Sequence, residues 1–109
     1  MGINRVTDPK AIKEQLQRIL SSPEFDATDR QKKFLRFVTQ MFLEGRAGEI
    51  KGYTVATDVF GRKTDFDPST DPIVSVEARR LRRALEHYYL TAGRRDLVRI
   101  TIPTGGYVP

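Results

Sequence analysis

Four arginines fall within five consecutive positions of one short stretch, which reads VSVEARRLRRALEHYY. They are Arg79, Arg80, Arg82 and Arg83. The planar guanidinium of arginine makes paired hydrogen bonds to phosphate and to the guanine edge, whereas lysine would serve solubility equally well. The choice of arginine at every basic position therefore indicates an anionic partner.

A helical projection predicts that these arginines form a patch. At about 100° per residue, the apolar members of the stretch share one arc, predicted to be buried: Val74, Ala78, Leu81, Leu85, Tyr88 and Tyr89. The arginines fall on much of the opposite side, where Ser75 and Val76 continue the patch toward the helix start. A solvated helix face is the alternative, but such faces usually mix charge signs at spacings of three and four, and only Glu86 follows here.

Composition limits what the chain can be. Its 109 residues fit one compact domain, 1–109, in which we expect residues 1–7 to be a flexible N-terminus. The net charge is +5, and residues 73–109 alone contribute +4. The sequence has no cysteine, no signal sequence and no apolar run of the roughly 20 residues that a membrane span requires. We therefore expect a cytoplasmic domain without membrane contact.

The sequence offers little for catalysis. It has one histidine, His87, and no recognisable nucleophile or acid–base pair, so we expect no enzyme and no catalytic residues. The glycine-rich turns lack the spacing and lysine of a phosphate-binding loop, and we expect no cofactor. Asp65, Asp67 and Asp71 lack the spacing, glycine and closing glutamate of a calcium loop, and we expect no metal.

Start and stop signals predict about four helices. The first begins at Asp8-Pro9 and is broken by Ser22-Pro23, and the second begins at the capping-box pair Thr28 and Gln31 and ends at Gly45. A short helix within YTVATDVFGRK follows, and the longest runs over about residues 72–92. The β-rich run from Leu97 to Ile102, a Pro-Thr-Gly-Gly turn and a strand through Tyr107 predict a C-terminal hairpin. The expected class is mainly α (α+β), with a C-terminal β-hairpin.

Helices followed by a longer basic helix and a hairpin form the pattern of a winged helix-turn-helix domain. VSVEARRLRRAL resembles the recognition helix of the OmpR/PhoB-type response-regulator output domains, ITIPTGGYVP resembles their wing, and YTVATDVFG is similar to their preceding helix. The resemblance covers about residues 34–109, and a helix stands in place of the family's N-terminal sheet. It implies bacterial transcription regulation through double-stranded DNA, with Arg80 and Arg82 contacting the DNA.

Together these arguments define a candidate DNA-binding surface. Its expected residues are Ser75, Val76, Arg79, Arg80, Arg82 and Arg83 in the major groove, with Lys51, Tyr53, Thr54 and Arg99 on the DNA backbone. A homodimer, tandem binding on DNA and additional C-terminal domains in a longer chain all remain open. The alternative function is that of a protein-interaction adaptor whose arginine face docks on an acidic partner.

Overall fold

The computed structural model describes residues 8–104 and 106–109, so the expectations for residues 1–7 and for Gly105 in the C-terminal turn lie outside the described residues. Its elements, in chain order, are α2 (Pro9–Ser21), α3 (Asp29–Leu43), the 3₁₀ helix η1 (Ala47–Glu49), α4 (Gly52–Asp58) and α5 (Ile73–Leu90). The expected mainly helical class is confirmed for this part of the chain.

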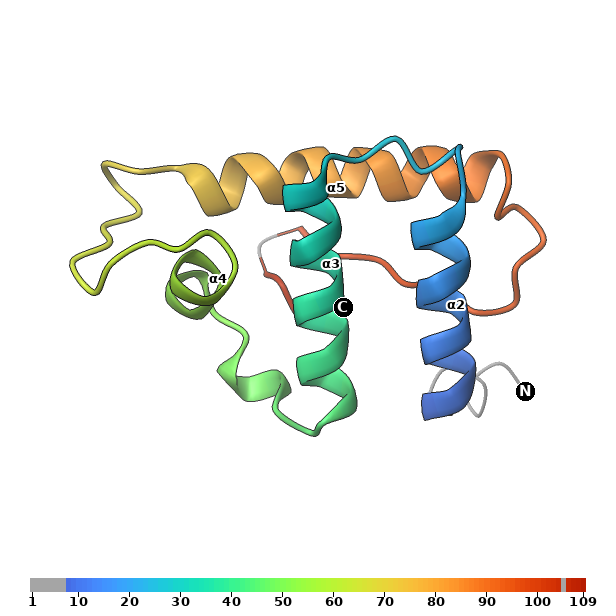
Figure 1. Cartoon of the computed structure of the whole chain (residues 1–109), viewed down its shortest axis with the longest axis horizontal. Helices are drawn as coiled ribbons and strands as arrows, with labels where there is room; N and C mark the ends of the chain where they lie inside the picture. The colour runs from blue at the N-terminus through green and yellow to red at the C-terminus, as the bar shows by residue number, and fades with distance from the viewer. Residues whose placement is uncertain (1–7, 105) are drawn as a thin grey trace.

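The helices are arranged around α5. In Figure 1, α5 runs along the top of the molecule, above α2 and α3, which lie side by side and run in opposite directions. α3 contacts both α2 and α5, and α4 contacts α5. Each short helix therefore packs against a longer one, which compensates for the low stability of isolated short helices in water.

Side chains of the N-cap residues mark the starts of α2 and α3. The Thr28 hydroxyl accepts a hydrogen bond from the backbone N–H of Gln31 (3.2 Å), and the Gln31 side chain accepts one from the N–H of Thr28 (3.1 Å). Asp8 caps α2 by accepting from the N–H of Lys10. These contacts satisfy N–H groups that have no partner within the helix.

The connection between α4 and α5 is shaped by aspartates. The Asp71 carboxylate accepts a hydrogen bond from Arg62 Nε (2.7 Å) and another from the backbone N–H of Ile73 (3.3 Å), at the start of α5. Asp67 accepts from the backbone and the hydroxyl of Ser69. Within residues 8–104 and 106–109, no three carboxylate or histidine side chains gather as metal ligands would.

One hydrophobic core joins all the helices and the C-terminal segment. Its largest fully buried side chains are Tyr88, Phe34, Ile19, Leu35, Leu81, Leu85, Val38 and Val55. Val98, Ile100 and Ile102 enter the same core from the C-terminal segment. Among the described helices, none combines the length and the apolar character needed to cross a bilayer.

The predicted C-terminal β-hairpin is wrong, and with it the winged form of the fold: the described residues contain no strand. The β-rich run is extended along the core, since Val98, Ile100 and Ile102 are buried while the residues between them are exposed. However, the described part of segment 97–109 makes no hydrogen bond from its backbone to another backbone group. Instead, side chains of α5 bind several carbonyls and one N–H of this segment. They provide the hydrogen bonds that a neighbouring strand would provide in a sheet.

A cluster around Asp96 attaches this segment to the helices. The Asp96 carboxylate accepts hydrogen bonds from the Tyr88 hydroxyl (2.6 Å), from Gln15 Nε2 (2.8 Å) and from Arg18 Nη1 (3.0 Å). Burial alone would raise the pKa of Asp96, but these hydrogen bonds outweigh it and hold the pKa below its usual value. The cluster joins α2, the end of α5 and the start of the C-terminal segment.

Leu81→Ala should lower the free energy of unfolding by about 2–5 kcal/mol, because its side chain is fully buried and the substitution leaves a cavity. Chemical denaturation measures this loss. Leu90→Ala is the matched control on the same helix, since Leu90 is 71% exposed. Equal stabilities for the two variants would show that α5 is rotated differently about its axis.

Stability should fall as the pH rises above about 10. Burial and the hydrogen bond to Asp96 raise the pKa of Tyr88 to about 12, whereas an unfolded tyrosine titrates near 10. Between these values the unfolded chain releases a proton that the folded chain keeps, so raising the pH favours unfolding, by at most about 1.4 kcal/mol per pH unit for this group.

Denaturation curves at pH 8–12 measure this effect, and Tyr88→Phe should have a shallower decline than the parent protein. Part of the decline should remain, because burial also raises the pKa of Tyr89. Identical pH profiles for the parent and Tyr88→Phe would contradict the assignment.

Candidate nucleic-acid interface

The rotation of α5 decides which of its side chains face solvent. All six apolar residues predicted to be buried are buried, and Ile73, Glu77 and Ala84 are buried as well. The buried stripe is therefore wider than predicted. On one side it extends up to the arginine patch, so that the exposed face is narrower than expected. Arg80 and Arg82 are two residues apart, or about 200° around the helix, so they border the stripe on opposite sides.

Arg79 and Arg83 occupy the centre of the exposed face. They are one turn apart, and both are exposed. Within the described residues, neither side chain makes a hydrogen bond or an ion pair, in contrast to the side chains of Arg80 and Arg82. Two like charges at a spacing of four repel each other, which lowers helix stability until an anion binds.

Arg80 pairs with a residue of its own helix. Its Nη1 lies 3.1 Å from Oε1 of Glu77, whose side chain is only 4% exposed, while the Arg80 side chain is 63% exposed. The guanidinium therefore satisfies a carboxylate that the core excludes from water. Sequence reasoning missed this role, although a glutamate three residues before an arginine was a visible signal.

Arg82 is bound to the C-terminal segment. Its Nε donates to the carbonyls of Ile102 and Pro103, both at 3.2 Å. Its Nη2 donates to Pro103 (2.8 Å) and to Gly106 (3.1 Å). Arg82 is half-buried, so the expectation that it lies in a freely exposed patch is met only in part.

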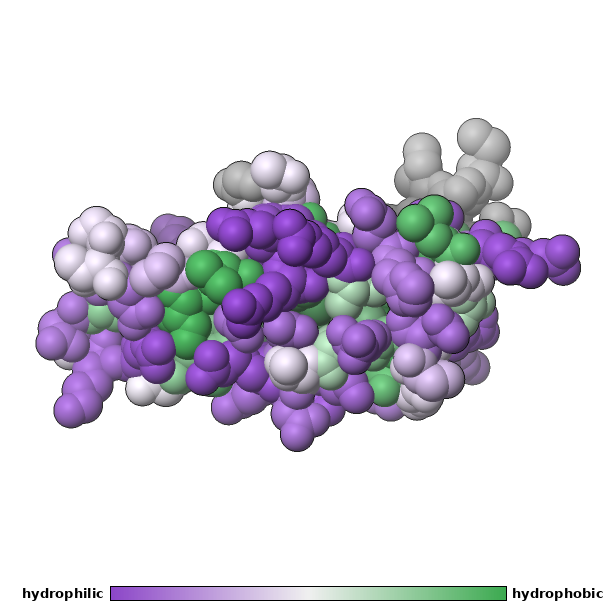
Figure 2. Space-filling model, turned by 90° about the horizontal axis from the view of Figure 1, so that it is seen from above, coloured by the Kyte–Doolittle hydropathy of each residue, from purple (hydrophilic) through white to green (hydrophobic). Residues whose placement is uncertain are grey.

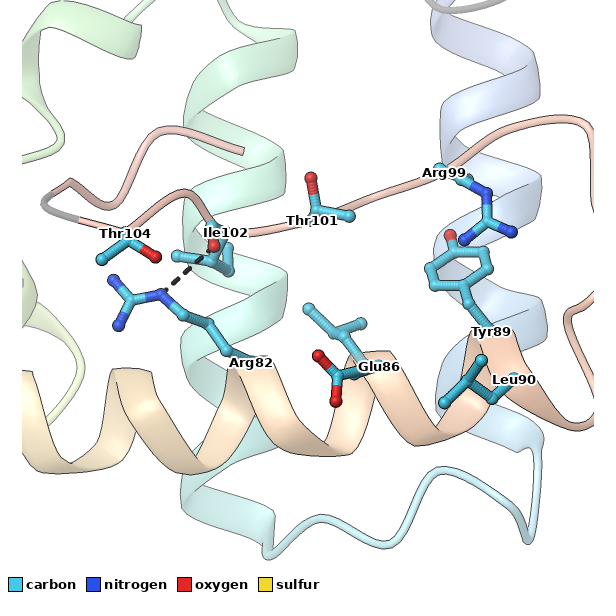
Figure 3. A pocket seen from close by; sticks show the side chains of 9 residues that line it. Arg82, Glu86, Tyr89, Leu90, Arg99, Thr101, Ile102 and Thr104 are labelled. Atoms are coloured by element: carbon cyan, nitrogen blue, oxygen red, sulfur yellow. Dashed lines mark hydrogen bonds between the residues drawn. The ribbon is translucent and has the colours of Figure 1, made fainter.

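Arg99 lines the same groove as Arg82. Its guanidinium stacks over the ring of Tyr89, 4.7 Å from the centroid, which is a cation–π geometry. Figure 3 shows Arg82 and Arg99 at opposite ends of a hollow of about 340 Å³, between α5 and the extended segment. Both cations border this groove.

The remaining predicted contacts lie at the N-terminal end of α5. Ser75 is exposed and its hydroxyl donates to the Pro72 carbonyl (3.0 Å), while Val76 is half-buried. Ser75 and Tyr53 line the same small hollow, of about 130 Å³. The structure therefore brings Tyr53 of α4 close to the start of α5.

Lys51 and Thr54 have different roles at the start of α4. The Thr54 hydroxyl donates within its own turn, to the carbonyl of Glu49 at 2.6 Å, and accepts from the N–H of Lys51 at 2.9 Å. Thr54 thus caps α4 and is committed to that contact. Lys51, by contrast, is exposed.

The face above α5 is hydrophilic as a whole. Seen from above, strongly hydrophilic residues gather over the middle of the helix, and small hydrophobic areas lie between them (Figure 2). Arg83 also borders an open hollow that it shares with Arg80, Asp26 and His87. The surface is thus a broad charged face with shallow hollows, which suits an extended polyanion better than a small substrate.

Comparisons with known proteins identify no relative. No family model matches the chain, and neither the curated proteins nor the solved structures include a significant match.

Arg80→Ala should lower the free energy of unfolding by about 1–3 kcal/mol, because it leaves the buried Glu77 carboxylate without its partner. Arg83→Ala is the control with the same loss of charge, and it should change stability by less than about 0.5 kcal/mol. Thermal and chemical denaturation measure both. Replacing Glu77 with glutamine in the Arg80→Ala background should recover part of the loss. Equal stability of the two single variants would rule out a structural role for the ion pair.

Proposed function

We propose that this chain binds double-stranded DNA through the exposed face of α5, as the DNA-binding part of a transcription regulator. The observation that carries the proposal is the pair Arg79 and Arg83, which are exposed and have no partner within the described residues. The sequence resemblance of α5 to the recognition helix of OmpR/PhoB-type output domains also supports it. A cytoplasmic location is part of the proposal, because the protein must reach DNA.

The dimensions of α5 suit the major groove. Its 18 residues span about 27 Å, and a helix fits the groove width of about 12 Å. Arg79 and Arg83 are about 6 Å apart along the helix axis, close to the roughly 6.8 Å of two base-pair steps. Each guanidinium is planar and can bind phosphate or guanine through two hydrogen bonds.

The structure divides the expected contacts into two groups. Arg79, Arg83 and Ser75 are exposed on the outer face of α5, and we propose that they contact the groove. Tyr53, in the first turn of α4, lines the same hollow as Ser75, and Lys51 is exposed directly before α4; we propose that both extend the surface toward the DNA backbone. Arg80 helps to keep the outer face of α5 in place through its ion pair with Glu77.

Fluorescence anisotropy of a labelled mixed-sequence duplex, titrated with the protein over a salt series, tests this function. The logarithm of the association constant should fall linearly with the logarithm of the salt concentration. Arg79→Ala and Arg83→Ala should each weaken binding and reduce the slope by about 0.9, because each removes one phosphate-neutralising cation. If an arginine binds guanine, its loss should instead cost about 1–3 kcal/mol at the preferred sequence.

Lys13→Ala is the control variant, since Lys13 is exposed in the N-terminal half of α2, at the opposite end of that helix from α5 (Figure 1). It removes one positive charge and should leave binding almost unchanged. A double variant of Arg79 and Arg83 that binds as well as Lys13→Ala would reject this face. If polyglutamate competes as effectively as DNA, the surface recognises acidic chains in general, and the adaptor function replaces this one.

A further inference from the structure

The guanidinium of Arg82 binds both arms of the C-terminal turn. Its carbonyl partners, Ile102 and Pro103 before the turn and Gly106 after it, lie within 2.8–3.2 Å. A strand ladder would satisfy such carbonyls with N–H groups. No backbone N–H does so among the described residues, so the hydrogen bonds to both arms come from one side chain of α5, while Ile102 and Tyr107 pack against the core on either side of the turn.

The turn lies beside the face that carries Arg79. Ser75, Arg79, Arg82 and Glu86 follow one another at spacings of four, three and four, which places them along the same side of α5. Thr104 is exposed, and it lines the same hollow as Arg82 and Glu86, as Figure 3 shows. Its hydroxyl is a group that commonly hydrogen-bonds DNA phosphates.

We propose that Arg82 is a positioning residue for DNA binding, which holds the turn beside α5 so that Thr104 contacts a phosphate of the DNA backbone. This inference rests on the proposed DNA-binding function. In this role Arg82 acts through the turn and not through a DNA contact of its own, because Nε and Nη2 both donate to the carbonyls of the turn. The sequence resemblance implied the opposite role for this residue.

Lysine cannot replace Arg82 in this role. A guanidinium offers five N–H donors in a rigid plane, and Nε and Nη2 of Arg82 both serve the turn. A lysine ammonium keeps the charge but is a single donor atom on a flexible chain. Arg82→Lys therefore separates the two roles: it preserves a phosphate contact made by charge and removes the support of the turn.

The test compares duplex binding, over the same salt series, by Arg82→Lys, Arg82→Ala, Thr104→Ala and the double variant of Arg82→Ala with Thr104→Ala. Arg82→Lys should bind roughly 3- to 10-fold more weakly than the parent, as should Arg82→Ala. Thr104→Ala should weaken binding by a similar factor in the parent background and add nothing in the Arg82→Ala background. Thr101→Ala is the matched control, because Thr101 is exposed in the same hollow but precedes the turn.

A second measurement reports directly on how firmly the turn is held. Limited proteolysis should cleave the segment 102–106 faster in Arg82→Lys than in the parent, while circular dichroism confirms that the helices remain folded. Parent-like binding by Arg82→Lys, together with a slope reduced by about 0.9 in Arg82→Ala, would make Arg82 a direct phosphate contact and overturn the inference. Equal binding by Thr104→Ala, Thr101→Ala and the parent would overturn it too and leave the DNA-binding function intact.

Failure of the underlying function gives a different result. If the parent protein binds no duplex even at low salt, the DNA-binding proposal fails, and the role of Arg82 in DNA binding fails with it. Faster proteolysis of Arg82→Lys would then show only that Arg82 holds the turn in place.

Discussion

The burial of one stripe along α5 fixes the rotation of that helix, and most other features of the structure follow from it. Residues from Ile73 to Tyr89 enter the core from this stripe, against α3, α4 and the C-terminal segment. Once the stripe is buried, the direction of every other side chain on α5 is determined. The outer face then carries Arg79 and Arg83, which have no partner in the described part of the chain, and the two borders carry arginines that serve the fold.

The borders of the stripe show how α5 organises polar groups as well as apolar ones. On one border, Arg80 satisfies a buried carboxylate. On the other, Arg82 and the Tyr89 hydroxyl bind backbone groups of the extended segment; Tyr89 accepts from the N–H of Ile100 (2.7 Å) and donates to the carbonyl of Val98 (3.1 Å). Buried backbone groups need such partners. Thus α5 is at once the main core helix and the hydrogen-bonding partner of the C-terminal segment.

Much of the helical architecture could be predicted from the sequence, because its signals are local. The capping box at Thr28, the proline after Asp8 and the apolar arc of α5 all act within a few residues. The hairpin could not be predicted correctly, because a β-rich run indicates that a segment is extended but does not show what binds its backbone. The same limit applies to the candidate surface, where the partner of Arg82 lies twenty or more residues away and has no signature in the sequence. DNA binding by this surface stays a prediction.

The way in which the C-terminal turn is held affects how it can detach. A strand ladder contains many separate hydrogen bonds, so it can fray from its end one bond at a time. Here a single guanidinium contacts three carbonyls, and one change of its side-chain rotamer breaks all of these contacts together. The hydrogen bonds between the turn and α5 are therefore lost in one event, while the apolar contacts of Ile102 and Tyr107 on either side of the turn hold it to the core.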